Sequence, residues 1–316
     1  MPPTLLITGA SSGIGRATAM HLAQRGWRVF GTSRNPARAD VPGVEMLALD
    51  VSDPASIRVC IDEVLRRAGR LDVLINNAGV IGPAAASEEL SEAQIRAVFD
   101  TNYFGVIAVT NAVLPSMRQQ RSGRILMIGS VAGVASLPPF FATYSASKHA
   151  LEAYSDSLAL ELRDFGIHVS LLRFGYIRTP IDQSIEAPAH PLPDYAAARE
   201  RVVAVDRYSI QHGSDPAIVV HAIETILDDP APQMRYTIGP DAHIIVWMKR
   251  LLPDPLYQRV GHQLFLQGDW DAQRLGLRRL LLDTSYAQQM LERLRPALAL
   301  LLTLLTLRRL LRRKGR

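Results

Sequence analysis

The first strand of this sequence leads directly into a glycine loop, and this junction restricts the fold more than any other feature. Residues 4–8 read TLLIT, and "TGASSGIGRATAMHLA" follows with Gly9, Gly13 and Gly15. Backbone that approaches a phosphate closely needs glycine, and a helix that begins there offers free N–H groups and a dipole that attract anions. The alternative is a tight turn that merely uses glycine. The strand–loop–helix context favours a dinucleotide site in an α/β fold.

Strand and helix patterns alternate after this loop. Short apolar runs predict further strands at 28–33, 44–49, 71–75, 124–128, 167–172 and 234–238. Helical patterns fill the intervals at 13–25, 54–68, 91–118, 143–165 and 215–228. Strand–helix–strand units with right-handed crossovers give a parallel sheet that helices cover on both faces. We therefore predict a Rossmann-type, doubly wound parallel sheet in a single domain.

The domain is expected to cover residues 1–245. Within it, residues 180–212 contain four prolines and few strand signals, which is typical of a mobile loop over a substrate cleft. Residues 246–316 form a C-terminal extension, irregular at first and helical at the end. Local signals also predict helix ends: an N-cap at Asp53, a capping box of Ser91 with Gln94, and a helix stop at Gly166.

Composition indicates a globular chain that is not disulfide-bonded. Of its 316 residues 48% are apolar, and Cys60 is the one cysteine, so no intramolecular disulfide can form. The N-terminus has no basic region or cleavage-like site, so it predicts a strand and not a signal peptide, which suits a cytoplasmic protein. Six basic residues within 308–316 account for more than the whole net charge of +5. The body is nearly neutral, which argues against binding to nucleic acid.

The tail at 296–316 has an apolar run over 297–307 followed by the six basic residues. Eleven helical residues span about 17 Å, well short of the roughly 30 Å hydrocarbon core of a bilayer. A helix that lies on a membrane surface, with arginines on anionic headgroups, is one interpretation. Packing of this helix on its own domain or on another subunit is the other, and the sequence does not choose between them.

Tyr144 and Lys148 stand one helical turn apart in "TYSASKHALEAYS", which begins at residue 143. At this spacing both side chains lie on the same helix face. An ammonium group beside a phenol favours the phenolate, so we expect Lys148 to lower the pKa of Tyr144. A tyrosine with a lowered pKa can move a proton near neutral pH.

With its T-G-x-x-x-G-I-G spacing, the sequence resembles the short-chain dehydrogenase/reductase family, in its shorter, non-extended branch. The resemblance continues in order along roughly residues 4–240. "LDVS" supplies Asp50, "NNAG" spans 76–79, "TNYFG" supplies Asn102, "GSVAG" supplies Ser130, and the pair described above completes the set. It implies an NAD(P)-dependent oxidoreductase that acts on an alcohol or a carbonyl, and it implies dimers or tetramers.

The resemblance also implies a role for each site residue. Tyr144 would exchange the proton, Lys148 would also hold the nicotinamide ribose, and Ser130 would donate to the substrate oxygen. Asn102 would hold a water that links Lys148 to solvent. No metal is expected. The cofactor would contact Gly9, Ser11, Ser12, Gly13, Ile14, Gly15, Ser33, Arg34, Asp50, Val51, Asn77, Ala78, Gly79, Tyr144, Lys148, Ile177 and Thr179.

Two positions depart from the family pattern. Ser130 lies fourteen residues before Tyr144, where thirteen is usual, so "LPPFFAT" has one inserted residue. Ser130 remains the expected catalytic serine, with Ser136 as its alternative. Phe174 replaces the proline that the family places after the sixth strand, whereas Ile177 and Thr179 keep the positions expected to hold the carboxamide.

The end of the second strand predicts NADP(H) rather than NAD(H). Enzymes that use NAD usually place a carboxylate there to bind the ribose hydroxyls. Here Ser33 takes that place and Arg34 follows it. A guanidinium can hold a 2′-phosphate with two hydrogen bonds, and Ser12 can add a hydroxyl. A surface arginine on a turn is the alternative.

The expected substrate is apolar. Residues 134–142, residues 176–212 and part of the C-terminal segment should form the pocket, and these stretches are rich in Leu, Phe, Pro and Ile. Residues 235–260 further resemble 17β-hydroxysteroid and retinol dehydrogenases, which implies steroid-like, retinoid-like or long-chain alcohols and ketones. An NADPH-binding sensor or scaffold without turnover is a rival, and the catalytic tyrosine argues against it. A sugar epimerase or dehydratase is a further rival, disfavoured by the glycine spacing and the short C-terminal region.

Overall fold

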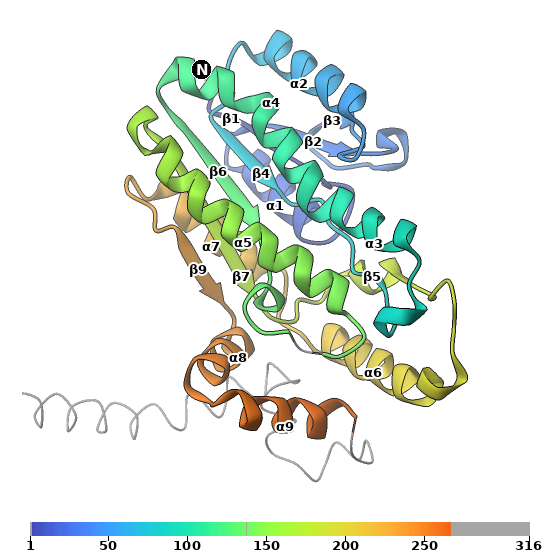
Figure 1. Ribbon diagram of the computed structural model, residues 1–316. Coiled ribbons are helices and arrows are strands. Elements are labelled where there is room, and N and C mark those ends of the chain that lie inside the picture. The colour runs from blue at the N-terminus through green and yellow to red at the C-terminus, as the bar shows by residue number, and fades with distance from the viewer. Residues whose placement is uncertain (1, 137, 267–316) are drawn as a thin grey trace, which may run out of the picture.

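A sheet of seven parallel strands forms the centre of the protein (Figure 1). The computed structural model describes residues 2–136 and 138–266. The sheet order is β3–β2–β1–β4–β6–β7–β9, and each neighbouring pair is parallel. The strands are β1 (Thr4–Ile7), β2 (Arg28–Ser33), β3 (Glu45–Ala48), β4 (Val73–Asn76), β6 (Gly123–Ile128), β7 (Ile167–Phe174) and β9 (Arg235–Ile238). The doubly wound parallel sheet predicted from the sequence is confirmed.

Helices cover both faces of this sheet (Figure 1). Helices α2 (Pro54–Ala68), α4 (Gly105–Gln120) and α5 (Ala142–Leu162) pack on one face, and α1 (Gly13–Gln24) and α7 (Ala217–Asp228) pack on the other. The strand order reverses between β1 and β4. In sheets of this kind ligands bind at such a reversal, beyond the carboxyl ends of the strands.

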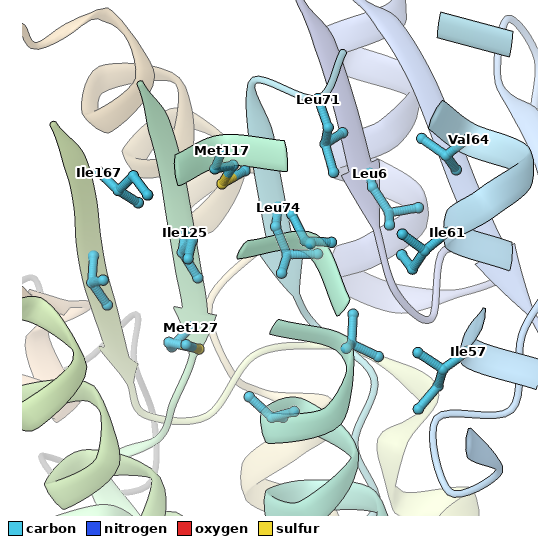
Figure 2. Packing of buried hydrophobic residues seen from close by; sticks show 14 of the residues in the cluster. Leu6, Ile57, Ile61, Val64, Leu71, Leu74, Met117, Ile125, Met127 and Ile167 are labelled. Atoms are coloured by element: carbon cyan, nitrogen blue, oxygen red, sulfur yellow. The ribbon is translucent and has the colours of Figure 1, made fainter. Parts of the chain in front are cut away.

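The alternation of side chains along β1 explains why the strands are apolar throughout. Leu6 belongs to the core under α2, α4 and α5, whereas Leu5 and Ile7 belong to the core under α1 and α7. Successive side chains of a strand point to opposite faces, so a strand covered on both sides needs an unbroken apolar run. Figure 2 shows the first of these cores, where Leu6 and Leu74 from the sheet lie beside residues of α2.

The expected helix ends are present. The Asp53 side chain accepts a hydrogen bond from the Ala55 N–H and caps α2, and Ser91 and Gln94 form the capping box of α3 (Glu92–Phe99). Gly166 ends the turn after α5 in a left-handed conformation. Residues 92–120 are long and apolar enough to cross a membrane by length and composition alone, but here α4 packs on the sheet and α3 lies against α5. A single π-helical turn, Asp100–Phe104, joins these two helices.

Residues 180–212 are not the open loop that the prolines suggested. After a 3₁₀ turn (Pro180–Ser184) and a short pair of strands, β5 (Gly82–Pro83) with β8 (Ile185–Glu186), they form α6 (Pro193–Gln211). Pro193 occupies the first helical turn, where proline is tolerated, so it starts this helix. The buried positions Val202, Val205 and Ser209 recur at helical spacing.

Glu89 anchors α6 to the rest of the domain. Its side chain is fully enclosed and accepts hydrogen bonds of 2.8 Å from the main-chain N–H groups of both Ala86 and Leu192. It also pairs with Arg199 of α6. The start and the middle of α6 are therefore held by one buried carboxylate.

The first part of the C-terminal extension is helical, where the sequence suggested irregular chain. Helix α8 (Pro240–Leu251) runs across residue 245, where the extension was expected to begin, and α9 (Asp254–Phe265) follows it. Leu264 and Phe265 of α9 pack against Val202 and Val205 of α6 in a third apolar cluster. The tail at 296–316, with its expected membrane or subunit contact, lies outside the described residues.

Candidate active site

A cavity of about 690 Å³ opens where the parallel strands end. One part of it, the glycine-loop side, is formed by Gly9 and residues 11–14, 32–34, 49–52 and 77–79. The other part, the α6 side, is formed by Pro138, Phe141, Tyr176, Ile177, residues 179–181, Gln183, Ser184, Glu186, Asp206, Ile210, Ile245, Leu264 and Phe265. Ser130, Tyr144 and Lys148 line the same cavity. All cofactor residues named from the sequence line it except Gly15.

The glycine loop has the geometry of an anion site. Gly9 and Gly13 have positive φ values of 67° and 54°, which favour glycine. A Cβ at Gly15 would lie 2.3 Å from the Gly9 carbonyl oxygen, so Gly15 lets the helix pack on the loop. Ser12 makes no capping bond with its side chain, and the first turn of α1 carries no acidic residue. The first N–H groups of α1 therefore face the cavity without competition from the chain's own anions, which fits the pyrophosphate of a dinucleotide.

The segment after β4 is fixed by β1. The Thr8 hydroxyl accepts hydrogen bonds of 2.9 Å from the N–H groups of both Asn77 and Ala78. The Asn77 side chain donates in turn to the carbonyls of Thr8 and Gly9, at 2.8 and 3.0 Å. The "NNAG" motif therefore holds the glycine loop and one wall of the cavity in a single arrangement.

Within the described residues, the end of β2 carries a buried hydroxyl without a hydrogen-bond partner, on Ser33, and an unpaired guanidinium, on Arg34. Asp50 is held by Ser52, whose hydroxyl and N–H donate to it at 2.6 and 2.9 Å and keep its pKa below the usual range. Arg34 adds a weaker electrostatic contribution in the same direction. A buried hydroxyl that lacks a partner beside a guanidinium fits an anionic group such as a phosphate.

The structure brings together three of the four residues named as catalytic. The side chains of Ser130 and Tyr144 are hydrogen-bonded, and Lys148 lies with its Nζ 5.8 Å from the centre of the Tyr144 ring. Lys148 Nζ donates to the Ile128 carbonyl at 3.0 Å, which fixes the ammonium group at the end of β6. Ser136 is exposed and lies outside the cavity lining, so Ser130 is the serine that meets Tyr144.

The pKa of Tyr144 differs from the sequence-based expectation. Burial raises it to about 12, the hydrogen bond from Ser130 lowers it in part, and the charge of Asp206 raises it further. Burial also lowers the pKa of Lys148 to about 8. In the protein groups alone, burial outweighs any lowering by Lys148. The lowering expected from Lys148 together with an oxidised nicotinamide stays a prediction. At neutral pH Tyr144 keeps its proton and Lys148 is mostly cationic.

The fourth residue, Asn102, lies in the π-helical turn and is 1% exposed. Its side chain exchanges hydrogen bonds of 2.9 and 2.8 Å with the Val80 main chain and donates to Ser147 Oγ at 3.1 Å. Three of its hydrogen-bonding positions are therefore used to fix the chain beside α5. The water-holding role that the resemblance implies stays a prediction.

The residues after β7 close the cavity opposite the glycine loop. Ile177 forms an isolated parallel bridge with Ser214, and a Cβ at Gly13 would lie 3.4 Å from the Thr179 Cβ. At Gly175 a Cβ would lie 1.9 Å from the carboxylate of Asp241, which accepts the Tyr176 N–H at 2.8 Å. The glycine of the "FG" pair is therefore required by packing, whereas Phe174 packs into the core under α1 and α7.

Sequence reasoning missed the polar groups of the α6 side. Asp206 and Tyr176 line the cavity, and their side chains are hydrogen-bonded to each other. Asp206 is 6% exposed and lies on the buried, mostly apolar face of α6 that Val202 and Ile210 also form. A carboxylate within the apolar stripe of a helix is a signal that could have identified it, once the helix itself was recognised.

The sequence profile described as short chain dehydrogenase matches residues 3–189, which is more than half of the chain. The chain belongs to the short-chain dehydrogenase family. A 3-ketodihydrosphingosine reductase of Bacteroides thetaiotaomicron is 38% identical over 260 residues, covering 81% of this chain and 96% of that protein. Retinol dehydrogenase 8 of Bos taurus is 32% identical, covering 84% and 91%. Estradiol 17-beta-dehydrogenase 1 of Rattus norvegicus is 36% identical, covering 73% and 72%.

Solved structures of short-chain dehydrogenases have the same fold. One from Streptomyces avermitilis is 34% identical with a TM-score of 0.70, covering 83% of this chain and 97% of that one. Another, from Burkholderia phymatum in complex with NAD, is 26% identical with a TM-score of 0.70, covering 82% and 95%. The family and the likeness to hydroxysteroid and retinol dehydrogenases are confirmed. The protein is an oxidoreductase of alcohols or carbonyls.

Proposed function

We propose that the protein interconverts an alcohol and a ketone or aldehyde in an apolar substrate, with NADP(H) as cofactor and Tyr144 as the acid and base. The observation that carries this proposal is the position of the hydrogen-bonded Ser130–Tyr144 pair. It lines one cavity that has an anion-binding glycine loop on one side and an apolar cluster on the other. A reacting carbonyl at this pair lies between a dinucleotide and an apolar body.

The residues at the end of β2 support NADP(H). Arg34 and the unpartnered Ser33 hydroxyl offer a cation and a hydrogen-bond donor where a 2′-phosphate would sit. No carboxylate occupies the end of β2, where NAD-dependent enzymes usually bind the ribose hydroxyls. One solved relative is described in complex with NAD, so the family itself does not decide between the two cofactors.

In the reducing direction, side chains of the protein supply the proton that the carbonyl oxygen accepts. When bound beside the Ser130–Tyr144 pair, a reduced nicotinamide would supply a hydride for the carbonyl carbon. Tyr144, which keeps its proton at neutral pH, donates it to the carbonyl oxygen, and Ser130 donates a hydrogen bond to the same oxygen. Lys148, held by the Ile128 carbonyl, places a positive charge near the phenolate that remains.

The α6 side supports a long or polycyclic apolar substrate. Phe141, Ile210, Leu264 and Phe265 are buried in the third apolar cluster and also line the cavity. The named relatives act, by their names, on a sphingoid ketone, a retinol and an estradiol. Steroid-like, retinoid-like and long-chain carbonyls are therefore the proposed substrate class.

A cofactor and substrate panel tests this proposal. NADPH consumption is followed by its absorbance with long-chain, steroid and retinoid carbonyls, and NADH is the matched control. We expect consumption with NADPH that depends on the carbonyl and is much slower with NADH. Equal or faster reaction with NADH would contradict the cofactor assignment. NADPH binding without consumption across the panel would favour a sensor.

A further inference from the structure

Asp206 is a carboxylate that lines the cavity and acts electrostatically on Tyr144, and the proposed reaction does not use it. It extends from α6 into the α6 side of the cavity and is 6% exposed. Ile210 and Phe265, which belong to the third apolar cluster, line the same space. Its charge acts directly on Tyr144, the residue that must contact the substrate oxygen.

No cation of the described residues forms an ion pair with this carboxylate. Tyr176 donates a hydrogen bond to it, and Tyr144, Asp182 and Arg207 are the other titratable groups that act on it. Asp241 faces Tyr176 from α8. Within the described residues Asp206 forms no ion pair, and Arg207 is the weakest of these influences. Burial raises the pKa of Asp206 to about 7.

A buried carboxylate without a cation is costly, because the protein interior solvates the charge poorly. An apolar side chain in the same place would extend the third apolar cluster at no such cost. An ionisable group with a shifted pKa in a substrate cavity is typical of a functional position. A positively charged group on the ligand would stabilise the ionised carboxylate of Asp206. The carboxylate would in turn fix the position of that group.

We propose that Asp206 binds a protonated amine of the substrate, so that the preferred substrates are long-chain amino ketones and the corresponding amino alcohols. This inference rests on the proposed function, since it assigns the substrate class of the same site. Asp206 and Tyr144 line the same cavity, so one ligand can place its amine at Asp206 and its carbonyl at Tyr144. The apolar chain then extends along Phe141, Leu264 and Phe265.

A neutral hydrogen-bond donor such as a hydroxyl fits this site less well than an amine. Tyr176 already donates a neutral hydrogen bond to Asp206. This bond lowers the pKa of the carboxyl group, but burial still holds it at about 7. A cation supplies the charge that the surrounding residues lack. A second anion would be repelled, which excludes substrates with a carboxylate or phosphate near the carbonyl.

Turnover of three matched ketones tests the proposal. All carry the same pentadecyl chain: an α-amino ketone, its N-acetyl amide, and the parent ketone without nitrogen. With NADPH we expect kcat/KM for the amino ketone to exceed that for the other two by about 30-fold or more. Asp206→Asn, which keeps the shape and removes the charge, is expected to bring the three values within a few-fold of each other.

Two further variants control this result. Asp182→Asn removes a neighbouring carboxylate that acts on Asp206, and it is expected to keep the preference for the amino ketone. If Asp206→Asn does not fold, Asp206→Leu replaces it, because an apolar side chain of similar size suits the third apolar cluster. This variant is expected to prefer the parent ketone.

Binding without turnover gives an independent measurement. The long-chain amino alcohol is titrated calorimetrically into the protein with NADP present, between about pH 6 and pH 8. An alkyl amine stays protonated in this range, so its affinity is expected to rise as Asp206 ionises through about pH 7, with proton release from Asp206. In Asp206→Asn the affinity is expected to be lower and independent of pH.

The two proposals fail in different ways. Equal turnover of all three ketones in the native enzyme, unchanged in Asp206→Asn, would overturn the amine site and leave the reductase assignment intact. Tight, Asp206-dependent binding of the amino alcohol without NADPH consumption would support the amine site and overturn the reductase assignment. Affinity for the amino alcohol that is the same in both proteins and flat with pH would show that Asp206 is a protonated structural residue.

Discussion

The glycine-loop side and the α6 side of the cavity are built in different ways. The glycine-loop side uses main chain, glycines and hydrogen bonds between the ends of adjacent strands, such as those between Thr8 and Asn77. The α6 side uses side chains from helices far apart in the sequence, joined through Glu89 and the third apolar cluster. A site built from main chain allows few residue types at each position, whereas an apolar packing surface allows many. This difference suits the proposed roles, in which the glycine-loop side binds the cofactor needed with every substrate and the α6 side adapts to one substrate.

The largest expected effect is a loss of kcat on substitution of Tyr144, which lies between the two sides of the cavity. In Tyr144→Phe the acid and base is removed and the ring stays, so kcat should fall by about 10³-fold. Both binding sides remain, so NADPH should bind within a few-fold of its original Kd. Stopped-flow turnover and fluorescence titration measure the two quantities. Tyr236→Phe, whose hydroxyl only accepts the Gln233 N–H, is the control. Substantial activity in Tyr144→Phe would mean that another group transfers the proton.

Glu89→Gln should disrupt the α6 side alone. The substitution leaves Arg199 buried without its partner, and we expect a loss of about 3 kcal/mol in the free energy of unfolding. The KM for the carbonyl should rise while the Kd of NADPH stays constant. Glu63→Gln, in a solvent-exposed cluster with Arg66 and Arg67, is the matched control for chemical denaturation. An equal loss in the two variants would remove the structural role given to Glu89.

Arg34→Ala should disrupt the glycine-loop side alone. Loss of a guanidinium from a phosphate should raise the Kd of NADPH about 30-fold and leave that of NADH nearly unchanged. Arg38→Ala, on the next turn, is the control. Calorimetric titration with both cofactors measures the difference. A similar loss for both would place Arg34 away from the 2′-phosphate.

The last prediction concerns the pH dependence of stability. The pKa of Asp206 is raised from 3.8 to about 7, so between these values the folded state holds a proton that the unfolded state has lost. Stability should therefore fall as pH rises through this range, by up to about 1.4 kcal/mol per pH unit. In Asp206→Asn this contribution should be absent. Urea denaturation of both proteins at several pH values measures it, and parallel curves would contradict the assignment.

The same contrast explains what could be predicted from the sequence. The glycine loop, the capping boxes and the apolar strands are local patterns, and the sheet followed from them. Asp53 caps the start of α2 and Gly166 ends the turn after α5, where their chemistry requires. These features depend on neighbouring residues in the chain, so a single sequence was sufficient to predict them.

Helix α6 and the environment of Tyr144 could not be obtained in this way. The prolines before Tyr195 suggested a loop, but the helix after them is stabilised by Glu89 and by Phe265, which are distant in sequence. The pKa of Tyr144 depends on burial and on Asp206, which only the folded chain provides. The inserted residue near Ser130 falls in a loop where Phe140 adopts a φ of 67°. A non-glycine residue in this conformation is strained by about 1 kcal/mol or more, and no local pattern predicts it.

Because one cavity runs from Arg34 at the end of β2 to Asp206 on α6, the two candidate specificity residues share a ligand complex without sharing a contact. Substitutions at separated sites with no common partner usually have additive free energies. Cofactor preference and substrate preference can then change independently, by mutation in nature or by design. A variant library at 33–34 can be crossed with one at 206–210, and each combination should behave as the product of its parts.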